Sequence, residues 1–189
     1  FKNCNIVLFV DFDLNAIAGH TIMITNYLNT LMKNNNNITI LTYYKISNKI
    51  FYENLELTLY NIIYIENSKS ALKYLNENNN LYDYVFIRTV FNNFIENMIS
   101  SSFLYKTIIY SLDIHLNEIL KLKNNFLYLI TQSDKLKRLF VDNNINKDKI
   151  IIIEPFAYKY NFKIPERSNK ETRLIYVGTL RDEENILEI

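Results

Sequence analysis

Two aspartates separated by one residue follow the first apolar run of the chain. Asp11 and Asp13 lie in the stretch LFVDFDLN, directly after this run. A carboxylate can attack phosphorus as a nucleophile or transfer a proton as a general acid. Carboxylate oxygens are also preferred ligands of Mg²⁺. The pair is therefore one candidate for phosphoryl chemistry.

Both glycines of the chain lie where an apolar run gives way to a helix-like pattern. Gly19 follows the run NIVLFV and a loop, and Gly178 directly follows LIYV. A glycine here lets backbone N–H groups approach an anion, and the next helix points its positive end at the same place. A turn that needs positive φ is the alternative explanation. The motifs G-x-G-x-x-G and GxxxxGK[ST] are absent from both loops, which argues against a dehydrogenase or a P-loop nucleotidase.

Four basic or imidazole side chains lie at predicted strand or helix ends. Arg88 ends the run YVFIR, where a buried charge must face a cleft or a carboxylate, so we expect an acceptor-side or phosphate contact or else a structural ion pair. Arg181 lies beside a predicted helix start and could pair with a diphosphate, or be solvated. His20 in the first loop and His115 after TIIYS could each reach a cleft or face solvent. Two histidines without partner ligands predict no metal site.

Short apolar runs alternate with longer amphipathic stretches along the chain. The runs are continuously apolar, as in parallel strands that are buried on both faces. This alternation predicts right-handed βαβ units and an α/β fold, a Rossmann-like open parallel sheet with helices on both faces. The predicted strands are residues 5–10, 38–43, 62–65, 84–88, 107–111, 126–131, 150–154 and 174–177, and the predicted helices are 21–34, 68–78, 90–100 and 133–143.

A polar stretch over residues 161–173 interrupts this pattern. It reads NFKIPERSNKETR, contains a proline and lacks apolar periodicity, so it predicts a linker. We expect one domain over residues 1–160 and the start of a second Rossmann-like domain over 174–189. Because the sequence begins without Met and ends inside a helical pattern, we expect it to be part of a longer protein.

The bulk composition narrows the class of protein. Of 189 residues, 49% are hydrophobic, which is enough for a substantial core. The formal net charge is +1, with 21 basic and 20 acidic residues, and this balance argues against a nucleic-acid binder. The single cysteine, Cys4, excludes an intrachain disulfide and fits a reducing compartment. With no signal peptide or membrane-spanning run in the sequence, we expect a cytoplasmic protein.

Several stretches together resemble the GT-B glycosyltransferases, in particular the retaining group 1 or family 4-like class that builds cell-surface polysaccharides. They cover nearly the whole chain in the family's order and spacing. The resemblance implies two Rossmann-like domains that face each other across a cleft, the first holding the acceptor and the second the nucleotide sugar. The matching stretches are NIVLFVDFDLNAIAGHTIMITNYLNTL, YDYVFIRT, LYLITQSDKLKRLF, DKIIIIEPFAY and YVGTLRDEENILEI.

The resemblance also implies roles for residues. Gly178 would be the donor-phosphate glycine, with Arg181 as the nearest cation and Gly19 as a second phosphate-side glycine. His115 would contact the donor sugar as the catalytic candidate. Beside these, we expect His20 and Arg88 to lie in the cleft on the acceptor side. The resemblance also implies that the donor would be a nucleotide-diphosphate sugar and that no metal or other cofactor would be required.

The sequence departs from the family pattern in three places. Thr179 and Glu184 stand where many relatives have an arginine and a lysine. The double glycine of the first loop is Ala18-Gly19, and the Asn-Gly after the proline is Phe156-Ala157. These changes concern the phosphate contacts and leave the predicted fold unaffected.

We therefore expect an enzyme that transfers a sugar to an acceptor hydroxyl in polysaccharide or glycoconjugate synthesis. The acceptor would be a saccharide or lipid-linked molecule, with peripheral membrane association of the full enzyme, and residues 1–189 alone would be inactive. One alternative is a haloacid-dehalogenase-like Mg²⁺-dependent phosphatase that uses Asp11 and Asp13, although Leu14 and Asn15 replace that family's Gly-Thr. The other alternative is a non-catalytic α/β binding module.

Overall fold

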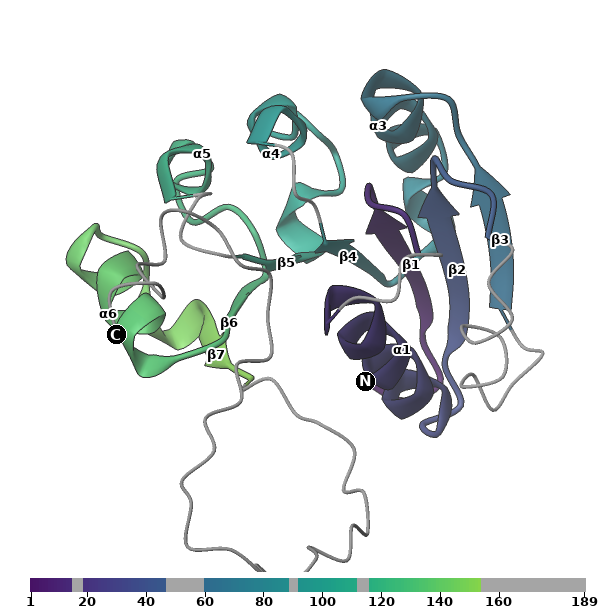
Figure 1. Ribbon diagram of the computed structural model, residues 1–189. Helices are drawn as coiled ribbons and strands as arrows, with labels where there is room; N and C mark the ends of the chain where they lie inside the picture. Colours follow the sequence, from purple (N-terminus) through teal and green to yellow (C-terminus); the bar gives the residue numbers. More distant parts are fainter. Residues whose placement is uncertain (15–18, 47–59, 89–91, 112–115, 154–189) are drawn as a thin grey trace, which may run out of the picture. The chain divides into compact units, whose positions relative to one another are not determined.

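The computed structural model describes residues 1–14, 19–46, 60–88, 92–111 and 116–153 (Figure 1). All of these lie within one compact unit, Phe1–Phe156. The predicted linker and the predicted start of a second domain lie outside the described residues, so the domain boundaries remain predictions. Among the described helices, none is long and apolar enough to cross a membrane.

The core of this unit is a sheet of seven parallel strands in the order β3-β2-β1-β4-β5-β6-β7 (Figure 1). Every described strand pair is parallel, which confirms the predicted open α/β sheet. The strands are β1 (Asn5–Val10), β2 (Asn37–Thr42), β3 (Tyr60–Tyr64), β4 (Tyr84–Arg88), β5 (Thr107–Tyr110), β6 (Tyr128–Thr131) and β7 (Ile150–Ile152). The helices are α1 (Gly19–Met32), α3 (Ser68–Glu77), α4 (Asn92–Asn97), α5 (Leu116–Lys121) and α6 (Asp134–Asp142).

Helices cover both faces of the sheet, and successive strand residues point to opposite faces. In β1, Leu8 packs in one cluster with Ile24 of α1, whereas Phe9 packs in another cluster with residues of α3 to α6. Phe9 stacks on Phe94 of α4 with ring centroids 4.1 Å apart. Figure 1 shows α1 on one side of the strands and α3 to α5 on the other. Burial on both faces explains why the strands read as continuous apolar runs.

Helix α6 begins where its sequence predicted. The hydroxyl of Ser133 accepts a hydrogen bond from the backbone N–H of Leu136 at 3.3 Å, so Ser133 is the N-cap. A hydroxyl in this position satisfies one of the N–H groups that have no partner within the helix. Phe140 is fully buried in the cluster on the α3 side.

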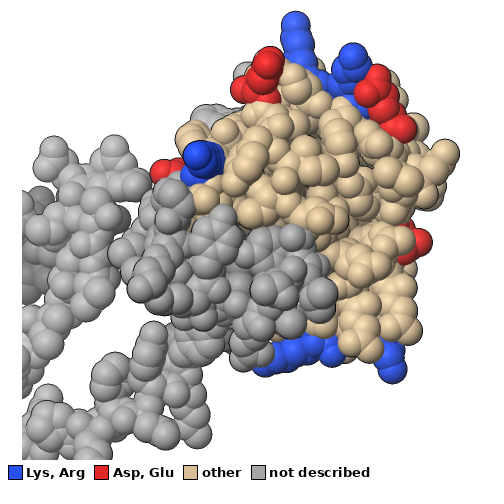
Figure 2. All heavy atoms as spheres, turned by 90° about the vertical axis from the view of Figure 1, so that its right-hand side faces the viewer, with Lys and Arg blue, Asp and Glu red and all other residues tan. Residues whose placement is uncertain are grey.

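One face of the unit carries charges of both signs. Figure 2 shows acidic and basic side chains at the upper margin of the face on the β3 side, mostly uncharged residues across its middle, and further basic side chains along its lower margin. Lys73 and Glu77 of α3 form an ion pair one helical turn apart, at 3.8 Å. Such exposed pairs contribute only about 0.3–0.5 kcal/mol, so this pair adds little to stability.

Candidate functional site

The strand order reverses between β1 and β4. From β1 the sheet continues through β2 and β3 in one direction and through β4 to β7 in the other. In open α/β sheets, ligands bind beyond the carboxyl ends of the strands at this kind of reversal. Asp11 follows β1 directly, and Gly19 begins the helix that comes next. We call the ends of β1, β4, β5 and β6, with the residues that follow them, the carboxyl edge.

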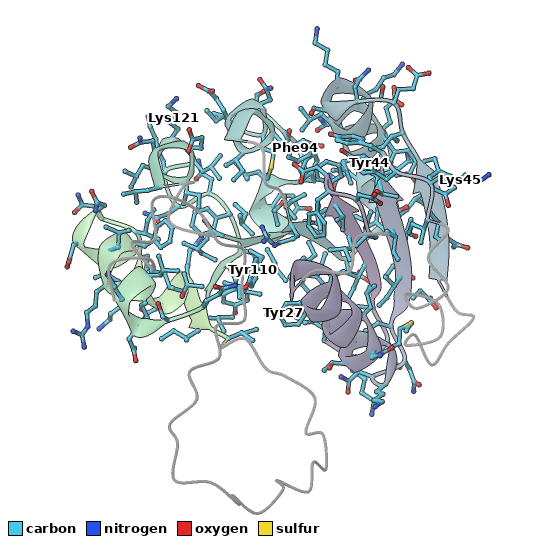
Figure 3. All side chains as sticks on the ribbon, viewed as in Figure 1. Tyr27, Tyr44, Lys45, Phe94, Tyr110 and Lys121 are labelled. Carbon is cyan, nitrogen blue, oxygen red and sulfur yellow. The ribbon has the colours of Figure 1, made fainter. Side chains whose placement is uncertain are left out.

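The sheet register brings side chains of three strands into one row at the carboxyl edge. Val10 pairs with Arg88 of β4, and Arg88 pairs with Tyr110 of β5. Residues aligned across a sheet share a face, and here it is the face that α1 covers. Tyr27 of α1 lies edge-on to Tyr110 with ring centroids 6.0 Å apart, and 6.1 Å from the ring of Phe86 (Figure 3). Helix α1 therefore closes over the end of this row.

Arg88 is the central residue of the row, and its side chain is only 3% exposed. Its guanidinium carbon lies 4.8 Å from the centroid of the Tyr110 ring and 5.6 Å from that of Phe12. A guanidinium over an aromatic face gains about 0.5–2 kcal/mol, more when water is excluded. Both rings therefore offset part of the cost of burying this charge.

A buried carboxylate lies among the charges that act on Arg88. Burial lowers the pKa of Arg88, whereas Tyr110, Asp11 and Tyr27 raise it. Asp11 is 1% exposed, so opposite charges are buried near each other at this edge. Burial also raises the pKa of Tyr110 and of Tyr27, whereas the positive charge of Arg88 lowers both pKa values. Both phenols are therefore neutral near pH 7, and the Tyr110 hydroxyl accepts a hydrogen bond from the amide nitrogen of Gln132.

The structure describes only some of the predicted site residues. Gly19 and His20 are the first two residues of α1, which follows the carboxyl end of β1. The structure thus brings the start of α1, Asp11 and Arg88 to one edge of the sheet. Three predicted site residues lie outside the described part of the chain, namely His115, Gly178 and Arg181.

The Asp-x-Asp motif is split between two environments. Asp11 is almost fully buried and Asp13 is half-buried. Within the described part of the chain, no group of three or more His, Cys, Asp or Glu side chains could hold a metal ion. Asp11 is buried and raises the pKa of Arg88, which fits a structural role for this carboxylate.

Three residues of the carboxyl edge were not predicted from the sequence. Phe12, Tyr110 and Gln132 contact Arg88 or one another. Each follows or ends an apolar run, as Arg88 does. Since the carboxyl ends of parallel strands meet at one edge, the first polar or aromatic residue after each run was a usable signal.

A hollow among the described residues lies at the other end of the sheet. Residues at or near the amino ends of β1, β2 and β3 line this hollow, so it does not belong to the carboxyl edge. The lining residues are Asn5, Asn37, Ile38, Thr39, Asn61, Leu81 and Tyr82.

Comparison with known proteins places the fold. No protein-family profile matches the sequence, and no curated protein matches it either. HepE of Anabaena, crystallised with UDP and glucose, is similar with a TM-score of 0.56 at 9% identity, over 80% of this chain and 44% of HepE. The lipopolysaccharide outer core galactosyltransferase WaaB gives 0.55 at 13% identity, over 88% of this chain and 50% of WaaB.

A glycosyltransferase of Rickettsia africae gives a TM-score of 0.53 at 14% identity, over 82% of this chain and 43% of that protein. The chain thus spans half or less of the length of these three proteins. Likeness at such identities concerns the fold alone. The described unit has the Rossmann-like fold found in GT-B glycosyltransferases.

Proposed function

We propose that this chain is the acceptor-side part of a glycosyltransferase that moves a sugar from a nucleotide-diphosphate sugar to an acceptor hydroxyl. One observation carries the proposal. The parallel sheet, with its order reversed between β1 and β4, is similar over about four fifths of the chain to a protein crystallised with UDP-glucose, HepE, which gives a TM-score of 0.55. The order of motifs in the sequence supports the same function.

On the donor side, the proposal assigns Gly178 and Arg181 to the diphosphate, with Gly19 at the facing edge. Backbone N–H groups at a helix start and a nearby guanidinium stabilise negative charge as it develops on the leaving nucleotide. A metal ion is not required for this kind of stabilisation. Thr179 and Glu184 leave Arg181 as the nearest cation to the glycine.

On the acceptor side, the proposal places a saccharide or lipid-linked hydroxyl near the carboxyl edge. His20 is the second residue of the helix there. His115 follows β5 in the sequence, and the proposal assigns it to the donor sugar, as the family resemblance implies. The role would be in polysaccharide or glycoconjugate synthesis, with transfer of a hexose by a cytoplasmic enzyme peripheral to the membrane.

The test is titration calorimetry of the full-length protein with UDP-glucose. A hydrogen bond to a charged group contributes about 1.5–3 kcal/mol, so Arg181→Ala should weaken binding roughly 10- to 100-fold. Gly178→Val should weaken it as well, because a branched Cβ would block the approach of the phosphates. Arg167→Ala, a matched change in the predicted linker, should bind as tightly as the parent.

Thermal melts check that all variants fold. If Gly178→Val and Arg181→Ala both fold and bind UDP-glucose like the parent, these two residues have no donor role. If the parent binds no UDP-sugar, the proposed function loses its main support. Turnover of an aryl phosphate that needs Mg²⁺ and disappears in Asp11→Asn would instead favour the phosphatase.

A further inference from the structure

Arg88 is enclosed on several sides by described residues. The rings of Tyr110 and Phe12 face its guanidinium. Asp11 and Tyr27 raise its pKa. We call Arg88, Asp11, Phe12 and Tyr110 the Arg88 cluster. Its members come from the segment after β1 and from the ends of β4 and β5. The cluster therefore joins three parts of the chain that are far apart in sequence.

The cluster leaves Arg88 poorly suited to contact a substrate directly. With 3% of its side chain exposed, the guanidinium has little surface for an incoming anion. The buried carboxylate of Asp11 already balances part of its charge. An arginine that binds phosphate would show the opposite features. Its N–H donors would be exposed, and no carboxylate would lie near it.

The residues after β1 connect the cluster to α1. Phe12 is 7% exposed and Leu14 is fully buried, and both belong to the same apolar cluster as Ile24 of α1. A shift of Phe12 away from Arg88 would therefore disturb the packing against Ile24 of α1. Dense packing transmits such shifts because interiors contain few voids.

We propose that Arg88 is a positioning residue that holds the segment after β1 against β4 and β5 and so fixes the start of α1. The statement that a donor and an acceptor bind near Gly19 rests on the proposed function. The clamp, by which we mean Arg88 holding the segment after β1 against β4 and β5, can be tested without any activity. The two proposals can therefore fail separately.

A double-mutant cycle on the 189-residue chain tests the clamp. Arg88 and Asp11 carry opposite charges and are both buried. Removing one of two such charges leaves the other without compensation, so Arg88→Met should lower the thermal midpoint by on the order of 10 °C. Asp11→Asn should lower it as well, and the double variant should lose clearly less than the sum. Glu77→Gln is the control, because Glu77 lies on α3 and pairs with Lys73, and it should be additive with Arg88→Met. Additivity of Asp11→Asn with Arg88→Met would overturn the clamp.

Hydrogen exchange separates positioning from a general loss of stability. Arg88→Lys keeps the charge but loses the planar group that stacks on the rings. At a temperature well below the melting point of this variant, the amides of residues 23–28 in α1 should exchange at least about tenfold faster than in the parent chain. The exchange rates of the α6 amides should be unchanged. Equal acceleration in α1 and α6, or none in either, would contradict a positioning role.

One measurement needs no variant. The Nε–H resonance of Arg88 in the parent chain is followed by NMR during titration with inorganic phosphate and with UDP. The proposal expects no saturable shift of this resonance with either probe. A saturable shift would identify Arg88 as a direct anion contact, as the sequence first suggested, and would overturn the positioning role.

Discussion

At the scale of single residues, two lysines at the amino ends of strands have matching roles. Lys106 precedes β5 and donates hydrogen bonds to the carbonyl oxygens of Asn79 and Tyr82. Lys149 precedes β7 and donates to the carbonyl oxygens of Asn124 and Phe126, each at 2.6 Å. In both cases one acceptor lies two residues before the neighbouring strand. Each lysine therefore joins the entries of two adjacent strands.

We predict that Lys106→Met is the more damaging of two equivalent changes. Lys106 is 8% exposed, so the change leaves the buried carbonyl oxygen of Tyr82 and the part-buried one of Asn79 without a charged donor. Such hydrogen bonds contribute about 1.5–3 kcal/mol, and we expect a loss of about 2–4 kcal/mol in the free energy of unfolding. Urea titration of the 189-residue chain measures it.

Lys149→Met is the matched comparison. Lys149 is only half-buried, so water can replace its ammonium group at the carbonyls. A smaller loss is expected, about 1–2 kcal/mol. An equal or larger loss than in Lys106→Met would show that burial does not control the contribution of these lysines.

At the scale of elements, asparagines end helices in a chain that has two glycines. After α6, Asn144 has φ 67°, the N–H of Ile145 bonds to the carbonyl oxygen of Phe140 at 3.0 Å, and that of Asn144 bonds to Val141 at 2.9 Å. This pair of bonds is the Schellman motif, which needs a left-handed residue. Asn35 and Asn124, with φ 57° and 59°, follow α1 and α5 in the same conformation.

At position 144, we predict that glycine is tolerated and that valine lowers the free energy of unfolding. Its side chain makes no hydrogen bond with the described residues, so it contributes mainly through its tolerance of positive φ. Asn144→Gly should therefore leave the free energy of unfolding unchanged within about 0.5 kcal/mol or raise it. Asn144→Val should lower it by about 1–2 kcal/mol, because a branched Cβ crowds the left-handed conformation. Urea titration gives both values.

Asn124 is the control for this prediction. Its side-chain amide donates to the carbonyl oxygen of Asn144 at 3.2 Å, and its amide oxygen accepts from the N–H of Asn146 at 3.0 Å. Asn124→Gly should thus cost about 1–2 kcal/mol although the backbone conformation suits glycine. If both glycine variants behave alike, side-chain hydrogen bonds do not distinguish the two positions.

The sequence predicted strands better than helices, for physical reasons. The bounds of β1 and β4 were predicted correctly because continuous β-branched and apolar runs are bordered there by polar residues. The helix predicted over 90–100 is longer than α4, Asn92–Asn97, since the chain turns after it with hydrogen bonds three residues apart, such as Met98 N–H to Ile95. Helix α5 was not predicted. Its six residues have only one buried side chain, too few to show periodicity.

The candidate site was predicted only in part. Arg88 was identifiable because a charge at the end of an apolar run is unusual. The rings of Phe12 and Tyr110 look like ordinary core residues in the sequence, and their contact with Arg88 depends on the register between β1, β4 and β5. Register is a long-range property that no local pattern contains.

At the scale of the whole molecule, the proposed function predicts that residues 1–189 alone transfer no sugar. Catalysis requires interactions that are stronger in the transition state than in the ground state. Under the proposal, most groups that would stabilise the charge on the leaving nucleotide belong to a domain of which this chain holds only residues 174–189. Removing even one such donor typically lowers kcat about 10²–10³-fold. The measurement is the release of UDP from UDP-glucose in the presence of a saccharide acceptor. The 189-residue chain is compared with the full-length protein. A thermal melt confirms that the chain is folded. Transfer by the chain alone at a rate comparable to the full-length protein would mean that the described unit contains its own donor site, and the division of roles between two domains would have to be abandoned.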